Sequence, residues 1–209
     1  MKKLLLTALI AAMMALPLGT VALADDETPI EPPVVNEEYV PGEAPAETSV
    51  HFMAPTLHAV LLAMENRDLT SFTADDPSLS WEMLYNLLSM YGQMDDRSVY
   101  DGEMLVLPSE TAMDYSAALF PAPLTSDTLP GELSDRITYN ADTDEYLLYC
   151  GSDALSEVVI TNTRDLGGMM AVSGKLMFLA EETELAAFTA TLAVADNLFG
   201  YTLVSLDVI

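Results

Sequence analysis

The chain has 209 residues, of which 51% are hydrophobic, and it carries 33 acidic but only seven basic residues, for a net charge of −26. The hydrophobic content predicts a folded core, and the negative charge argues against binding to nucleic acid or to anionic lipid. Cys150 is the only cysteine, which excludes a disulfide within this sequence and a zinc site built from cysteines.

The first 24 residues have the three parts of a secretory signal peptide. Lys2 and Lys3 give a positive start, an apolar run covers residues 4–16, and residues 22–24 (Ala-Leu-Ala) form a cleavage site of small residues. A transmembrane anchor is the alternative, but the apolar run is short and is broken by Pro17. We therefore expect a secreted protein, extracellular or periplasmic, without a stable membrane anchor. Removing residues 1–24 leaves five basic and 33 acidic residues, a net charge of −28.

Residues 25–49 predict a disordered linker. This segment holds five prolines, eight acidic residues and no basic residue, a composition that favours an extended and self-repelling chain. We expect a single folded domain over residues 50–209. A spacer rich in Pro and Glu behind a Lys-Lys leader is typical of an exported bacterial protein.

Apolar residues at helical spacing predict three helices in the first half of the domain. They are expected over about residues 55–67, 77–91 and 109–119. Pro55 and Pro77 suit the first turn of a helix, and Gly92 should end the second helix. Ser109 is the expected cap of the third helix.

Later in the chain the period of the apolar residues changes from about 3.6 to 2, which predicts strands. A short strand is expected at 104–107, before the third helix. The later strands are expected over residues 137–140, 145–150, 158–163, 170–178, 188–194 and 201–208.

Helices followed by a run of strands indicate an α+β fold. Short turns between the strands favour antiparallel neighbours. We expect three helices packed on one face of a twisted antiparallel sheet of five or six strands. This layout resembles the cone-shaped folds of the cystatin and nuclear-transport-factor type, as an analogy of fold alone.

Few residues are available for catalysis. His51 and His58 are the only histidines, so a Ser-His or Cys-His site would need one of them, and the sequence has no G-x-S-x-G motif. We expect two ordinary surface or boundary histidines and a small core cysteine at Cys150, which has no basic neighbour in sequence. No catalytic residue and no cofactor is assigned, and the chain is not expected to be an enzyme.

Asn140, Asp142 and Asp144 place oxygen ligands at alternate positions, as the start of a calcium loop does. An EF-hand would continue with Gly at its sixth position and Glu at its twelfth, but these positions hold Glu145 and Gly151. A hairpin turn is therefore the favoured interpretation, and a weak calcium site is the alternative.

The leading functional prediction is a non-catalytic binding or accessory domain that contacts another protein of the envelope or the extracellular space. The outward faces of the last strands, including Tyr201 and Leu203, are the expected partner surface. Two alternatives stay open: a small secreted hydrolase that uses a pair of carboxylates, and a calcium-stabilised extracellular module.

Overall fold

The computed structural model describes residues 47–150 and 155–209. The expected signal peptide lies outside these residues, as does most of the expected linker. The first described element is a 3-10 helix at Glu47–Met53, so regular structure begins three residues before the expected domain start at Val50.

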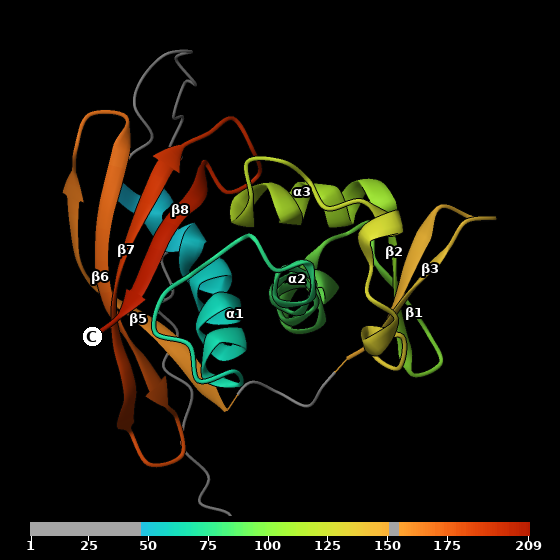
Figure 1. The fold of residues 1–209 in the computed structure, drawn as a ribbon, viewed down its shortest axis with the longest axis horizontal. Helices are drawn as coiled ribbons and strands as arrows, with labels where there is room; N and C mark the ends of the chain where they lie inside the picture. Colours follow the sequence, from blue (N-terminus) through green and yellow to red (C-terminus); the bar gives the residue numbers. More distant parts are fainter. Residues whose placement is uncertain (1–46, 151–154) are drawn as a thin grey trace, which may run out of the picture. The chain divides into compact units, whose positions relative to one another are not determined.

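The fold is α+β, as predicted, with three α-helices and two four-stranded antiparallel sheets (Figure 1). The helices are α1 (Ala54–Glu65), α2 (Pro77–Tyr91) and α3 (Ser109–Leu119). The first sheet has the order β1-β2-β4-β3 and contains β1 (Val99–Asp101), β2 (Met104–Pro108), β3 (Ile137–Asn140) and β4 (Glu145–Tyr149). The second has the order β5-β6-β7-β8 and contains β5 (Ser156–Asp165), β6 (Met169–Phe178), β7 (Thr183–Val194) and β8 (Tyr201–Val208).

The expected single sheet of five or six strands is therefore wrong. The helices lie between two separate sheets: α2 and α3 contact β4 of the first sheet, whereas α1 contacts β5 and α3 contacts β8 of the second (Figure 1). α2 buries nine of its 15 residues, and α1, α3 and β4 all contact it, so its cover comes from more than one side. One cluster of buried hydrophobic residues runs through both sheets and all three helices.

The ends of α2 follow the sequence signals. Pro77 opens the helix, Asp76 Oδ1 accepts a hydrogen bond from Ser78 N at 2.9 Å, and Gly92 is the C-cap. The expected Ser109 cap of α3 is wrong, because Ser109 is the first helical residue and Pro108 stands at the cap position without a side-chain hydrogen bond.

Two ion pairs join the segment just after α1 to the N-terminal half of α2 and its cap. Arg67 Nε lies 2.7 Å from Glu82 Oε2, and Arg67 Nη1 lies 3.2 Å from Asp76 Oδ2. The Glu82 side chain is only 9% exposed. A carboxylate in such a place needs a cation beside it, so Arg67 fixes how the two helices meet.

Close packing in the second sheet depends on Gly174 of β6. The Phe188 ring of β7 covers this glycine so closely that an added Cβ would stand 2.6 Å from Phe188 Cζ and 2.7 Å from Val159 O. Only glycine permits this approach of the aromatic ring to the strand.

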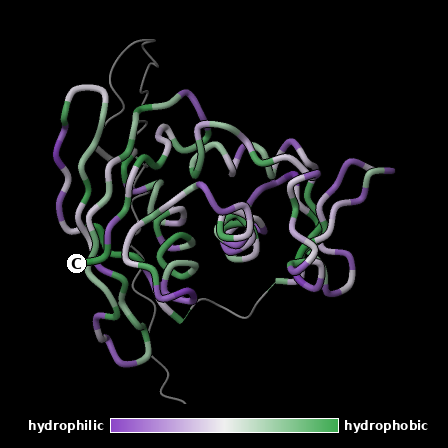
Figure 2. The backbone as a smooth tube through the Cα atoms, in the orientation of Figure 1, coloured by the Kyte–Doolittle hydropathy of each residue, from purple (hydrophilic) through white to green (hydrophobic). Residues whose placement is uncertain are grey.

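The distribution of hydrophilic and apolar residues agrees with this arrangement of helices and sheets. Hydrophilic residues gather at the β3–β4 and β6–β7 hairpin ends, and apolar stretches run along the strands of the second sheet (Figure 2). Within the described residues, no helix is both long and apolar enough to span a bilayer.

Candidate functional site: an apolar groove beside strand β8

A β-bulge sets which side chains of β8 face the core. Thr191 of β7 pairs with Ser205, but the next residue, Leu192, pairs with Leu203, so Val204 is an extra residue without a partner. A bulge of this kind reverses the alternation of inward and outward side chains along a strand.

The expected exposure of Tyr201 and Leu203 is therefore wrong. They are 1% and 2% exposed, and both belong to the core, whereas Val204 is 48% exposed. Strict alternation counted back from Leu206 would place Val204 inside and Leu203 outside, and the bulge inverts this order. The exposed large hydrophobic side chain in the middle of β8 is therefore Val204.

Val204 and Leu203 line an apolar groove of about 530 Å³. Phe72 and Ala74, which follow α1, line another part of it, as do Leu119 at the end of α3 and Pro121 just after it. The ends of β7 and β8 complete the lining, and the described lining residues are uncharged. The volume falls within the range of about 300–1,000 Å³ that ligand sites in proteins occupy.

Side-chain hydrogen bonds hold the walls of this groove together. The Asn197 amide nitrogen lies 2.9 Å from Ala117 O on α3 and 3.0 Å from Tyr201 O, and Thr202 Oγ1 donates to Ala117 O at 2.6 Å. Ala117 O is one of the last carbonyls of α3, which have no partner inside the helix. The β7–β8 turn is thereby fixed to the end of α3.

The Phe72 wall is fixed in a similar way. Its ring stacks on Phe120 with the centroids 6.3 Å apart, and Phe72 N donates to Leu206 O at 2.7 Å. The segment that contains Phe72 thus pairs with the far end of β8 and leaves the strand before Val204. The groove begins where this pairing stops.

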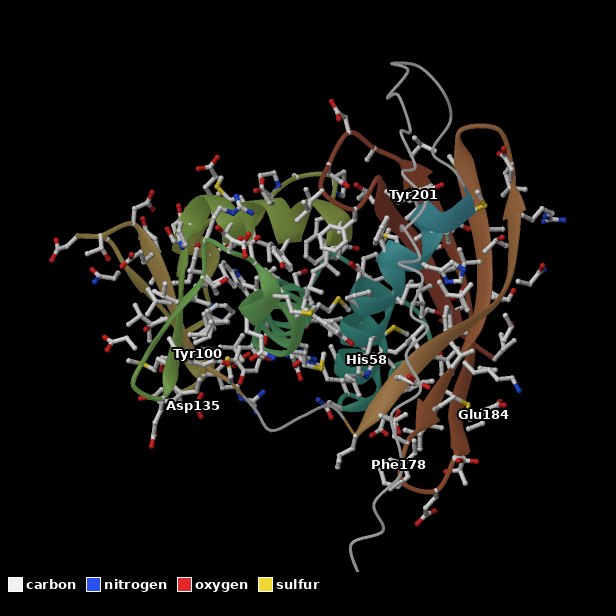
Figure 3. All side chains as sticks on the ribbon, turned by 180° about the vertical axis from the view of Figure 1, so that it is seen from behind. His58, Tyr100, Asp135, Phe178, Glu184 and Tyr201 are labelled. Atoms are coloured by element: carbon white, nitrogen blue, oxygen red, sulfur yellow. The ribbon has the colours of Figure 1, made fainter. Side chains whose placement is uncertain are left out.

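A second group of polar side chains is buried away from the groove. His58 lies on α1 (Figure 3) and is fully buried. Its Nδ1 is 2.6 Å from Tyr91 Oη and its Nε2 is 2.9 Å from Ser156 Oγ. Burial lowers the pKa of His58 to about 4, so the ring is neutral near pH 7, with one nitrogen donating and the other accepting. This cluster joins α1, α2 and β5, and the expectation of a surface or boundary position for His58 is wrong.

The other residues singled out in the sequence lie apart from the groove. Asn140 Oδ1 accepts from Asp142 N at 3.0 Å, and Asp144 Oδ1 accepts from Tyr139 Oη at 2.8 Å. Both hydrogen bonds belong to the β3–β4 hairpin turn, as the favoured interpretation predicted. Hydrogen bonds from Ser109 and Tyr139 lower the pKa of Asp144.

Within residues 47–150 and 155–209, no three His, Cys, Asp or Glu side chains are placed to hold a metal.

Two further residues from the sequence are exposed or half-buried. His51 is exposed, and Cys150 is a free, half-buried cysteine that packs against the core.

No family model matches this chain, and no curated protein matches it significantly.

Proposed function

We propose that this chain is an exported bacterial binding or accessory domain that holds its partner, without catalysis, in the groove beside β8. The observation that carries this proposal is the β8 bulge, which turns Val204 out of the core and into an uncharged groove of about 530 Å³. Bulges often re-aim a side chain next to a functional site.

Burial of apolar surface would supply the affinity. Each Å² of apolar surface removed from water contributes about 25 cal/mol, and the exposed Val204 and half-buried Phe72 both offer such surface. The hydrogen bonds of Asn197 and Thr202 keep the walls in place before a ligand arrives, which reduces the entropy that binding costs.

A carboxylate-dependent hydrolase has less support. Its general acid needs a raised pKa, and the two described carboxylates with a resolved shift, Asp95 and Asp144, both have a lowered pKa. Asp95 owes this chiefly to its hydrogen bond from Arg97, and Asp144 to its hydrogen bond from Ser109.

Fluorescence of Nile red, an uncharged apolar dye, tests the groove. We expect the dye to bind the purified protein and Val159→Lys, but to bind Val204→Lys at least tenfold more weakly. Val159 is the matched control, because it is also an exposed valine on an edge strand of the second sheet. Equal binding by all three proteins, or binding by none, would contradict the proposal.

A further inference from the structure

The outer edge of β8 is only partly covered. The segment after α1 pairs with one end of it, where Phe72 N donates to Leu206 O at 2.7 Å and Val208 N donates to Thr70 O at 2.8 Å. An isolated bridge on this side joins Ser71 to Asp207. Among the described strands, none pairs with this edge from Leu203 to Ser205.

The uncovered part of the edge and the apolar groove are the same place. Leu203 and Val204 belong to both, and Phe72 stands where the covering segment turns away. An open strand edge offers backbone donors and acceptors, and the groove next to it offers room for apolar side chains. Together these are the two requirements for an extended peptide that adds a strand to a sheet.

Acidic residues that neighbour the groove lining in sequence indicate which charge a bound peptide should carry. Asp75 follows the lining residue Ala74 directly, and Asp196 follows Ala195 in the same way. Both are exposed, and within the described part of the chain neither carboxylate has an ion-pair partner. The chain as a whole carries a net charge of −26. A ligand with cationic ends around an apolar centre complements these two carboxylates and the acidic chain as a whole.

We infer that the groove binds an extended, apolar peptide segment flanked by Lys or Arg, which adds a strand to the edge of β8 at Leu203–Ser205. This inference rests on the proposed function and names the partner of the same groove. The peptide's backbone hydrogen-bonds to the edge, alternate side chains enter the groove beside Val204, and the flanking cations lie near Asp75 and Asp196.

The test uses the purified protein and the fluorescein-labelled peptide Lys-Val-Thr-Val-Lys, with binding followed by fluorescence anisotropy. We expect the peptide to bind the wild type and Val159→Lys, and to bind Val204→Lys at least tenfold more weakly. The charge-reversed peptide Glu-Val-Thr-Val-Glu should bind at least tenfold more weakly than the original.

Two N-methylated forms of the peptide test the backbone pairing. One carries methyl groups on the odd-numbered amides and the other on the even-numbered amides. Because alternate amides of a strand point to the same neighbour, one form should lose binding at least tenfold and the other should keep it. Equal loss or equal retention by the two forms would overturn the strand addition.

The Nile red experiment separates the two proposals. If the dye binds in a way that depends on Val204 but no peptide binds, the groove takes an apolar group of another kind and the peptide inference fails alone. If neither the dye nor the peptide binds, both proposals fail.

Discussion

His58 of α1 and Ser156 of β5 are 98 residues apart in the chain, yet His58 Nε2 lies 2.9 Å from Ser156 Oγ inside the fold. On its other side the ring meets the hydroxyl of Tyr91, so an imidazole without solvent contact joins three elements. Such a group is tolerated only while it stays neutral.

This arrangement predicts a loss of stability in acid. The folded state keeps His58 neutral down to pH about 4, whereas the unfolded chain takes up a proton near the ordinary pKa of 6.5. The unfolded state therefore binds more protons between these values, and the free energy of unfolding should fall as pH falls, by at most about 1.4 kcal/mol per pH unit from this group. Urea unfolding of the wild type and of His58→Gln between pH 7 and 4 measures the effect. The variant should depend less on pH across this window, and identical slopes would contradict the prediction.

Gly174→Ala should destabilise the second sheet by about 1–3 kcal/mol, because its Cβ would collide with the Phe188 ring and with Val159 O. The control is Gly131→Ala, where an added Cβ meets nothing within 4 Å. Chemical denaturation of both variants provides the measurement. Similar unfolding free energies for the two would show that the strand relaxes around the new methyl group.

Arg67→Met should cost about 2–4 kcal/mol of stability, because it leaves the shielded Glu82 carboxylate without its cation. Lys175→Met removes a partner from the Lys175–Glu184 pair, whose side chains are both more than 40% exposed, and should cost less than about 1 kcal/mol. The double variant Arg67→Met/Glu82→Met should be more stable than the sum of its single changes implies. Additive losses would show that the pair contributes little.

Calcium should not change the melting temperature. Asn140 and Asp144 already accept hydrogen bonds within the β3–β4 turn, so a cation would have to compete for these oxygens. Thermal unfolding in millimolar calcium and in EDTA compares the two conditions. A clear rise of Tm with calcium would support the calcium-stabilised module instead, since a ligand of the native state must stabilise it.

Local signals in the sequence were sufficient for much of the secondary structure. The ends of α2 follow from Pro77 and Gly92, whose backbone preferences act within a few residues. The bounds of β8 follow from period-two alternation. Such signals need no knowledge of what a segment packs against.

Local sequence signals could not predict the groove. A bulge at Val204 shifts the alternation by one residue, and the pattern of β8 alone is equally compatible with the opposite face. Phe72 forms its wall through a pairing with Leu206, 134 positions later, for which the sequence gives no local sign. The strand Val99–Asp101 also escaped prediction, since all three of its residues are exposed and carry no apolar alternation.

The packing of the helices between the two sheets, with α3 in contact with both, determines how the protein unfolds. Since α2 and α3 contact the first sheet and α1 and α3 contact the second, loss of either sheet strips cover from helices that the other still needs. Cys150 is the only cysteine, so no internal cross-link holds the halves together once packing is lost. Melting should thus be all-or-none, and a protease that cuts inside one sheet should leave no resistant fragment of the other.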